Sequence, residues 1–519
     1  MAEATQTVKQ KAGGVNLDQV VLIKAGSPNV EFDLNSYIVE LSIFEDIFSN
    51  ALSGSLVISD SNNLIGSVPI IGGEILNISV SVPGYPNSSI QRSFYVYSIK
   101  DRANTSGDRQ QMYILYFISL EAMVDNITFI SKKYAGDGDE IAKEIFSEYL
   151  AMPRYWNKDW KFPAGMSKDN SFTIPDWKKE ITTKNLSPLI TKKDSDGVVT
   201  KMIESAEKVA KTAAKIALDV ATGGVTNALG INPFSGAKKI TFVVPMWTPF
   251  KAINWLANRH LDEGSISPTT LFWETTQGFY FTSIDSIFKA QSERGLRKRF
   301  FYGLDDAAIK VIMDNKAKTG KNTQNGLPAD YTKVESVLIP KSTDILQSQD
   351  NGHYSSNLLT LDIVTKKYQE NIFDYASNFS TFEHLHGKKN SPQPTFATQQ
   401  LRNFYSYKTF RPTHTKLFND YEVPKHEDTV LQRTSILYDI SNIKIEISVP
   451  GFCTTQAGEV VEFYYPKIGT KFEKLELKNL VDPYLSGSYL VTAVRHIILR
   501  DKYYMRLELA KESFATGLG

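Results

Sequence analysis

The sequence predicts an α+β protein that is mainly β, with an antiparallel β-barrel at each end of the chain and a helical and irregular region between the barrels. Residues 18–130 form short runs of alternating apolar and polar side chains separated by turn residues, as strands of a barrel or sandwich do. A similar succession of strands returns in residues 426–519. Much of the chain between them changes to the apolar period of helices or to irregular, polar sequence.

Length and composition restrict the class of protein. A chain of 519 residues exceeds one ordinary core, so we expect about two to four domains. The 58 basic and 57 acidic residues give a net charge of +1, which argues against a protein that grips nucleic acid. The only cysteine, Cys453, excludes an internal disulfide and suits assembly in a reducing cytoplasm.

The N-terminal residues 1–17 are polar and contain no apolar export signal, so we expect a flexible arm. No apolar run reaches the roughly 18 residues of a membrane-spanning helix. We therefore expect no membrane anchor and synthesis in the cytoplasm.

Residues 18–130 are expected to form the first barrel. Val39, Leu41 and Ile43 alternate with polar neighbours, so they should share one buried face. Gly72-Gly73 and Pro83-Gly84 mark turns. The seven expected strands read QVVLIKA, VEFDL, SYIVELSIF, GSLVISD, EILNISVSV, SFYVYSIKD and MYILYFISL.

Residues 131–247 are expected to be a helical and irregular insertion. A first helix should run from Asp137 to Leu150, with aspartate at its cap and an apolar stripe that includes Ile141 and Ile145. An Ala-rich helix is expected over 198–222, interpreted as an amphipathic helix lying on its own domain. A weak coiled coil and a membrane-surface helix remain alternatives.

Residues 248–376 are expected to form a middle α+β domain. Thr248 is a good N-cap and Pro249 suits the first helical position, so a helix should start here. After Pro268 the apolar period changes to two, and LFWET and FYFTSI read as a hairpin whose three-residue loop ends at Gly278. Within the polar stretch from Lys289 to Thr343, KAKTGKNTQNG is expected to be an exposed loop, and residues 377–425 an irregular excursion.

The last region, residues 426–519, repeats features of the first barrel. Gly458-Glu459 before a strand matches Gly73-Glu74, and both regions end on a long hairpin. In each hairpin the second strand carries three alternating residues that align between the two regions. The spacing before the hairpins differs by about ten residues. The alternative is that any two antiparallel hairpins look alike. The three alternating residues are Tyr113, Leu115 and Phe117 in the first region and Tyr503, Met505 and Leu507 in the last.

The helix PFKAINWLANR followed by FWETTQGFYFTSIDSIF resembles the middle of the tail-hub (baseplate hub) proteins of contractile-tailed bacteriophages and the hub half of type VI secretion spike proteins. The resemblance covers the two barrels and residues 248–288, while the Ala-rich helix and residues 290–343 fall outside it. It also implies that residues 357–376 are a connector leading towards the second barrel. The family is built from two such barrels per chain.

The resemblance implies a structural baseplate hub, a homotrimer whose ring adapts a sixfold tail tube to a threefold central spike. Its further implied partners are baseplate wedge components and the tape measure protein, with DNA passing through the channel without specific binding. The implied location is the tail baseplate of the virion. The alternatives are a virion-associated enzyme that degrades cell wall or polysaccharide, and a receptor-binding tail module.

Two groups of residues have side chains of the types that bind metal ions. Asp137, Asp139 and Glu148 match some positions of a calcium loop, but the turn glycine is missing and helix capping explains the aspartates better. His384 and His386 could point one way from a strand as zinc ligands do, but no further ligand stands at a known spacing. We interpret the two histidines as a solvent-exposed pair.

Glu274 beside Trp273 could have a raised pKa like a general acid, but a hydrolase needs a second carboxylate that the sequence does not single out. We interpret Glu274 as an outward strand residue. Cys453 has no nearby histidine, and no phosphate-binding loop occurs. Aromatic runs such as Tyr464-Tyr465 and Tyr503-Tyr504 are read as core and interface residues. The sequence thus predicts no catalytic, cofactor-binding or metal-binding residue, and no enzyme.

Overall fold

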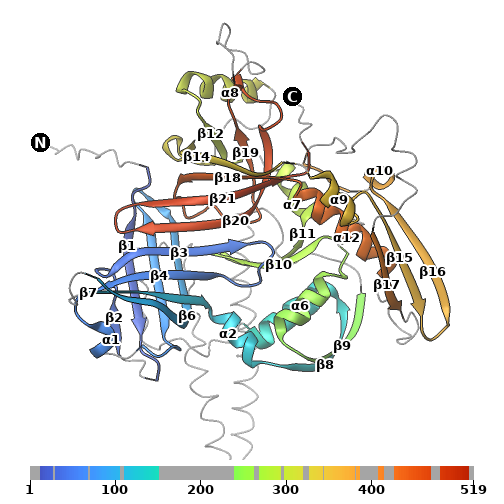
Figure 1. Cartoon of the computed structure of the whole chain (residues 1–519), viewed down its shortest axis with the longest axis horizontal. Coiled ribbons are helices and arrows are strands. Elements are labelled where there is room, and N and C mark those ends of the chain that lie inside the picture. The colour runs from blue at the N-terminus through green and yellow to red at the C-terminus, as the bar shows by residue number, and fades with distance from the viewer. Residues whose placement is uncertain are drawn as a thin grey trace, which may run out of the picture.

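The structure is a computed structural model, and it is mainly β with helices packed around the sheets (Figure 1). The Ala-rich helix expected at 198–222 and His386 lie outside the described residues. The structure describes residues 12–26, 30–67, 70–105, 110–150, 239–261, 268–293, 297–318, 326–342, 344–379, 382–385, 407–413, 426–468 and 480–513.

The seven strands expected near the N-terminus are all present and form one half of a large sheet, which we call the N-terminal half. Their order across the sheet is β3-β4-β7-β6-β5-β1-β2, and every pairing is antiparallel. The short helix α1 (Leu64–Ser67) follows β4. The strands are β1 (Asn16–Ile23), β2 (Glu31–Asp33), β3 (Ile38–Asp46), β4 (Ser53–Asp60), β5 (Ile75–Val82), β6 (Tyr85–Thr105) and β7 (Gln110–Ser119).

Alternating burial holds this half together. Leu56 and Ile58 of β4 are buried against the core, and Phe117 of β7 lies over Gly54. A Cβ at Gly54 would come within 2.2 Å of the Phe117 ring, so only glycine fits there. Val39 was expected on the buried face but is exposed, because an irregularity between Ile38 and Glu40 in the pairing with β4 turns it outward.

Seven other strands form the C-terminal half, in the order β14-β18-β21-β20-β19-β12-β13. Three of them lie within residues 299–342, most of which we expected to be polar connecting chain, and the helix α8 (Asp306–Lys318) includes the start of the expected exposed loop. A 3-10 turn, η2 (Ala329–Tyr331), precedes β13. The strands are β12 (Arg299–Tyr302), β13 (Lys333–Val334), β14 (Ser336–Ser342), β18 (Ile443–Pro450), β19 (Val460–Tyr464), β20 (Gly487–Leu499) and β21 (Tyr503–Lys511).

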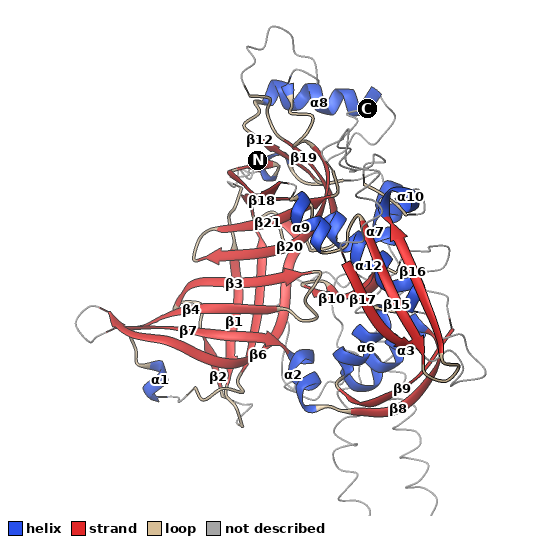
Figure 2. Cartoon of the chain, turned by 45° about the vertical axis from the view of Figure 1, so that its right-hand side comes forward, coloured by secondary structure: helices blue, strands red, loops and turns tan. Residues whose placement is uncertain are grey.

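The two halves join edge to edge through β3 and β20. These strands pair antiparallel from Asp46 opposite Ala493 to Glu40 opposite Leu499. Figure 2 shows β18, β21, β20, β3 and β4 following one another from top to bottom. The result is one fourteen-stranded sheet, and its pairing does not close into a barrel within the described residues.

A smaller unit packs beside the N-terminal half, and its helix and hairpin were expected. Helix α6 starts at Pro249 with Thr248 as its N-cap, and Ile253 and Leu256 are buried. The N–H of Phe250 donates to the Asp125 carboxylate at 2.6 Å, so a residue of α2 satisfies the helix start. Its elements are α2 (Leu120–Ile127), β8 (Ile130–Asp137), α3 (Gly138–Ile145), η1 (Phe146–Leu150), β9 (Lys239–Trp247), α6 (Pro249–Ala257), β10 (Thr270–Thr275), β11 (Gly278–Ser283) and α7 (Ile284–Glu293).

A three-stranded sheet, β16-β15-β17, lies against helix α12 (Figure 2). Strand β17 pairs parallel with β15, so part of the excursion expected to be irregular is a strand. The elements are α9 (Ile345–Asp350), β15 (Ser355–Asp362), β16 (Lys367–Asp374), α10 (Tyr375–Asn378), β17 (Tyr407–Thr413) and α12 (His426–Ile440).

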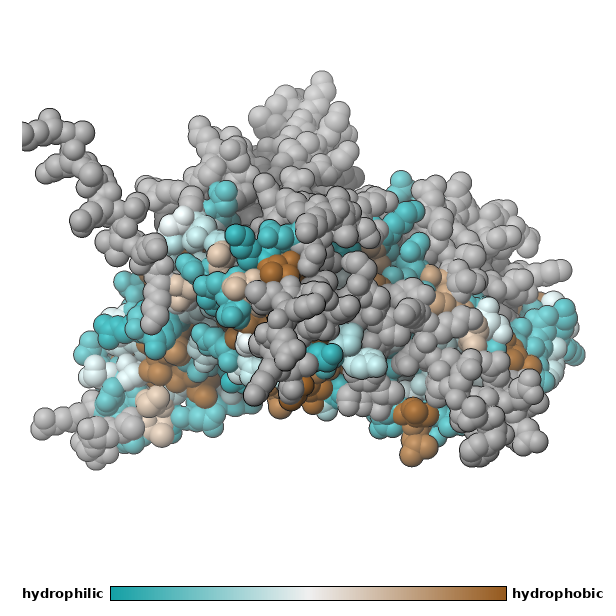
Figure 3. Space-filling model, turned by 90° about the horizontal axis from the view of Figure 1, so that it is seen from above, coloured by the Kyte–Doolittle hydropathy of each residue, from teal (hydrophilic) through white to brown (hydrophobic). Residues whose placement is uncertain are grey.

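The surface carries apolar side chains in separate groups among hydrophilic ones, as the view from above shows (Figure 3). Within the described ranges, no helix has both the length and the apolar character needed to cross a membrane.

Candidate functional site

The aromatic hairpin β10–β11 is buried on both faces and connects two hydrophobic cores. Trp273 pairs with Tyr280, and both side chains belong to the core of the large sheet. Phe272 and Phe281 lie on the opposite face and belong to the core of the smaller unit. The hairpin therefore fixes the position of the smaller unit against the large sheet.

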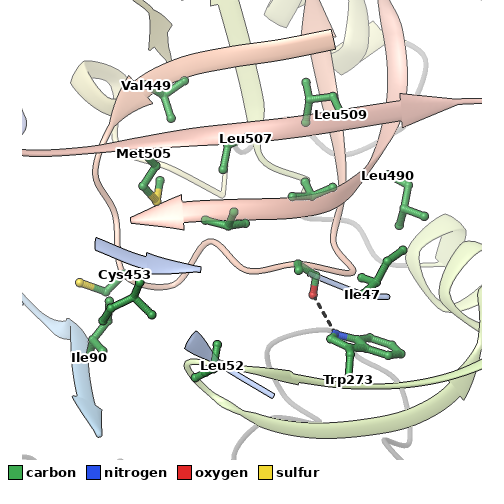
Figure 4. Packing of buried hydrophobic residues seen from close by; sticks show 14 of the residues in the cluster. Ile47, Leu52, Ile90, Trp273, Val449, Cys453, Leu490, Met505, Leu507 and Leu509 are labelled. Carbon is green, nitrogen blue, oxygen red and sulfur yellow. Dashed lines mark hydrogen bonds between the residues drawn. The ribbon is translucent and has the colours of Figure 1, made fainter. Parts of the chain in front are cut away.

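Trp273 occupies the centre of this contact. Its indole N–H donates to the carbonyl of Ala457 at 3.4 Å, the bond drawn in Figure 4, where Ile47 lies beside the ring. Gly458, at φ +93°, lies under the ring, and a Cβ there would be 2.9 Å from Cζ2 of Trp273. Both the backbone conformation and the close approach therefore call for glycine at this position.

The hairpin turn is shorter than expected. Thr275 pairs with Gly278, so the loop contains two residues instead of three, and Gly278 takes a positive φ of 148° within β11. The N–H of Thr276 in this turn points at the carboxylate of Glu45 from β3.

Glu45 connects four segments of the chain, and we call this group the Glu45 cluster. One carboxylate oxygen accepts the N–H of Thr276 at 2.7 Å, and the other accepts the N–H of Ala457 at 2.8 Å. His496 Nε2 of β20 lies 3.4 Å from the same carboxylate, and His496 Nδ1 lies 2.7 Å from the Tyr503 hydroxyl. The cluster thus fastens the β3–β20 joint to the hairpin and to the loop before β19.

Burial alone would raise the pKa of Glu45, but its hydrogen bond to His496 and the charge of that residue, with the Thr276 N–H, lower this pKa below its ordinary value. The carboxylate is therefore ionised inside the protein. A buried carboxylate whose oxygens accept hydrogen bonds stabilises the arrangement of the groups that donate them.

Glu274 is buried, which contradicts its interpretation as an outward strand residue. Only 2 % of its surface is exposed, its Oε2 accepts the N–H of Leu52 at 2.8 Å, and Oε1 lies 3.3 Å from Nη2 of Arg92. Burial raises its pKa to about 8, against the nearby positive charge of Arg92, and the negative charge of Glu121 raises it further. The structure therefore identifies Glu121 as a second carboxylate whose charge acts on Glu274, which the sequence did not single out.

Glu274 joins separate elements and is closed off from a substrate. A general acid must come within hydrogen-bonding distance of the group it protonates, and Glu274 is enclosed between β4, β6 and the hairpin. The charge of Arg92 lowers the pKa of both carboxyl groups, but burial outweighs it and raises each pKa above its ordinary value.

Replacing Glu274 with glutamine is expected to flatten the dependence of stability on pH. Between about pH 4.5 and about pH 8 the folded protein keeps a proton on Glu274 that the unfolded chain releases, so stability falls as pH rises through this window. Glutamine resembles the protonated form and does not titrate, so Glu274→Gln should gain stability relative to wild type as pH rises through this window. Urea unfolding at a series of pH values checks this; parallel curves for the two proteins would contradict it.

His384 is also enclosed, so the prediction of a solvent-exposed histidine is wrong. Its Nδ1 lies 2.6 Å from Oε2 of Glu512, and its Nε2 lies 2.8 Å from the carbonyl oxygen of Phe379. The ring stacks on Phe379 at 3.7 Å between centroids. Asp439 lies close by, and its pKa is raised by burial and by the charge of Glu512.

The His384, Asp439 and Glu512 side chains are near enough to one another to be tested as metal ligands. Both nitrogens of His384 face acceptor oxygens, so the ring carries two protons and offers no lone pair to a metal in this arrangement. Nδ1 of His353 faces the carbonyl oxygen of Ser435, which leaves the lone pair of its Nε2 directed at Asp439, 3.5 Å away. A protonated Asp439 can donate to this nitrogen, so these side chains hold protons in the present arrangement.

The His384–Glu512 pair is expected to make stability depend on pH. Burial lowers the pKa of His384, but the hydrogen bond and charge of Glu512 outweigh burial and raise it to about 8. The stabilisation is therefore complete below the unfolded pKa near 6.5 and is lost as pH rises through about 8. His384→Gln should destabilise the protein more at about pH 5.5 than at about pH 9. An equal loss at both values, measured by chemical unfolding, would show that the charge of His384 does not matter.

The other candidate residues do not converge on a site. Asp137 occupies the N-cap of α3 without a side-chain hydrogen bond to the helix, Asp139 lies 3.6 Å from Lys143, and Glu148 lies 2.8 Å from Lys132. Cys453 is buried, and burial raises the pKa of its thiol to about 12, which is the opposite of an activated nucleophile.

The two sheet halves repeat the same arrangement of five strands. In β3-β4-β7-β6-β5 and in β14-β18-β21-β20-β19, the strands occur in the same chain order and all neighbours are antiparallel. Gly73 N–H donates to Val96 in one half and Gly458 N–H donates to Val491 in the other, each at 2.8 Å. An irregularity in strand pairing follows each of these valines.

These shared contacts correct the alignment expected from the sequence. Val96 pairs with Phe117, and its counterpart Val491 pairs with Leu509. Phe117 therefore corresponds to Leu509, two residues beyond the expected Leu507. The two halves therefore repeat the same strand topology. The alternating side-chain pattern alone could not distinguish two registers that differ by two residues.

Comparison with known proteins gave no match to a protein-family model and none to a curated protein sequence. Among solved structures, the chain is similar to a tail protein from Neisseria meningitidis MC58, with a TM-score of 0.45 and 10% identity over 96% of this chain and 97% of that one. It is also similar to the 43 kDa tail protein of prophage MuSo2 from Shewanella oneidensis, with a TM-score of 0.43 and 8% identity over 96% of this chain and 99% of that one.

A third similar structure is the lidded PdpA-VgrG complex of Francisella, with a TM-score of 0.38 and 7% identity. It covers 99% of this chain and 55% of the matched chain. These three similar structures are thus two tail proteins, one of them from a prophage, and a complex that contains VgrG.

Proposed function

We propose that the chain is a structural hub protein of a contractile phage tail, located in the tail baseplate of the virion. The observation that carries the proposal is the pair of topologically equivalent sheet halves joined edge to edge within one chain. Two equivalent units per chain give six units in a homotrimer, and such a ring matches a sixfold tube on one face and a threefold spike on the other. Each half would then complete a barrel when its open edges meet neighbouring subunits.

The buried polar groups support a structural role. The Glu45 cluster, Glu274 with Arg92, and His384 with Glu512 each connect strands or loops that are far apart in sequence. Their side chains are occupied by partners inside the protein, so they hold the two halves and the hairpin in one arrangement. A hub must keep its docking faces in fixed relative positions, and these contacts provide that rigidity.

The proposed partners are a second and third copy of the chain, a central spike protein, tail tube proteins, baseplate wedge components and the tape measure protein. DNA would pass through the central channel without specific binding. The net charge of +1 suits such a channel, because a strongly positive wall would retain phosphate groups.

The self-association part of the proposal is tested by light scattering after size-exclusion chromatography of the full chain at increasing concentration. A homotrimer has three times the chain mass of 58.3 kDa. We expect that mass at high concentration; a particle of any other fixed stoichiometry would contradict the threefold hub.

A further inference from the structure

At the joint between the two halves, β3 pairs with the part of the β20 edge that β19 does not reach. β19 pairs with β20 only as far as Leu490, and the loop before β19 adds a contact to Val491. Beyond that point, residues 493–499 of the same edge of β20 pair with β3. The edge of β20 therefore has two successive neighbours, β19 and then a strand from the other half.

The equivalent strand of the N-terminal half, β6, has only the first of these neighbours. β5 pairs with β6 up to Tyr95, and the loop before β5 reaches Val96. Beyond Val96, no strand of the described residues pairs with this edge of β6, although the strand continues to Thr105. Residues 100–103 are exposed. An open strand edge presents backbone donors and acceptors to another strand.

The equivalent of β3 in the C-terminal half is β14, and it has an open edge too. β14 pairs with β18, and the structure assigns its other edge no strand among the described residues. Leu338 on β14 is 60% exposed, and Leu346 on the following helix α9 is 75% exposed. By contrast, Ile47, which follows β3, is 1% exposed, and its N–H donates to Thr492 across the completed joint at 3.0 Å.

We propose that β14 of one copy of this chain adds to the open edge of β6, residues 98–105, in a second copy. This contact would reproduce between chains the β3–β20 joint that each chain makes internally. It rests on the proposed trimeric hub and specifies which edges join its subunits. The contact is head-to-tail, and it closes into a ring when three chains complete the rotation.

The repeat also gives the register. β6 has a second irregularity, between Lys100 and Ala103, that β20 lacks, so positions are matched through the residues that pair with them. Ser42, Ser55, Tyr116 and Ser98 lie in one row across the N-terminal half. The matching row of the C-terminal half runs Leu338, Glu446, Glu508 and Ala493.

Leu338 therefore corresponds to Ser42, which lies opposite Ile497 in the completed joint. Ile497 pairs with Tyr504 as Ala103 pairs with Met112, so Leu338 should lie opposite Ala103 of the second copy. Pro340, which has no N–H, falls in the irregular part of β14. The regular pairing should therefore run from Ser336 to Leu338, opposite Ala103 to Thr105.

Cysteine cross-linking tests the register directly. The full-length variants Leu338→Cys and Ala103→Cys are mixed and oxidised, and a disulfide between the two chains is read on a non-reducing gel. Directly opposed residues on neighbouring strands are close enough for such a bond. The control mixture replaces Ala103→Cys with Tyr484→Cys, an exposed position outside both edges. We expect a covalent dimer only from the first mixture, since the native Cys453 is buried.

A charge variant tests the same contact without a cross-link. The double variant Leu338→Asp with Leu346→Asp changes two exposed side chains, so it should keep the wild-type thermal transition and weaken self-association by about tenfold or more. Ile468→Asp, at another highly exposed position, should leave self-association unchanged.

The outcomes separate the two proposals. Trimers that form no cross-link between positions 338 and 103 and that tolerate the double variant overturn the edge pairing and leave the hub proposal standing. A wild-type chain that stays monomeric at every concentration overturns both.

Discussion

Replacing Val491 with aspartate is expected to prevent the chain from folding its C-terminal half. Val491 is fully buried on β20, next to the joint with β3, and its backbone pairs with the loop before β19. A carboxylate buried at this place is cut off from water, so the free energy of unfolding should fall by about 4–5 kcal/mol or more. Urea unfolding, and recovery of soluble protein, measure this loss.

The matched control is Val39→Asp, the same substitution at an exposed strand position. Its effect should stay within about 0.5 kcal/mol. Because both variants add the same charge, a similar loss in the two would show that burial of Val491 does not cause the effect. Self-association of Val491→Asp at the wild-type level would contradict the prediction most strongly.

Replacing Glu45 with alanine should have the second-largest effect, a loss of about 3–5 kcal/mol in the free energy of unfolding. The change leaves the N–H groups of Thr276 and Ala457 without their acceptor and His496 without its carboxylate. Buried donors that lose their acceptor pay their full desolvation penalty. The measurement is chemical unfolding near neutral pH, where wild-type Glu45 is ionised.

Glu40→Ala provides the control for Glu45→Ala. Glu40 lies on the same strand and pairs with Arg495 at 3.0 Å, but both side chains are about one-third exposed. Solvent screens such pairs, so the loss should stay within about 1 kcal/mol. If the two alanine variants unfold alike, the Glu45 cluster does not hold the joint together.

Local patterns predict the N-terminal half well because its strands are long and separated by clear turns. The expected strands of this half, the helix after Thr248 and the aromatic hairpin are all present. β12, β13 and β14 were not expected because they lie within a polar stretch that shows no clear alternation. Pairing with the neighbouring strands β18 and β19 stabilises β14 and β12 there.

The polar contacts at the centre of the molecule could not be predicted from the sequence. Glu45 and Ala457 are 412 positions apart, and Glu274 and Leu52 are 222 apart. No local period connects such residues, so a buried glutamate looks like an outward one in a strand. The Gly-Glu pairs before β5 and β19 did signal the repeat, while its register needed the pairing of β6 with β7 and of β20 with β21.

The most direct test of the hub proposal is negative-stain electron microscopy of the purified full-length chain, at concentrations that drive self-association. We expect rings with threefold symmetry, six similar lobes and a central opening, because each chain supplies two equivalent sheet halves. Open filaments, twofold particles or solitary compact particles at every concentration would contradict a ring-forming hub.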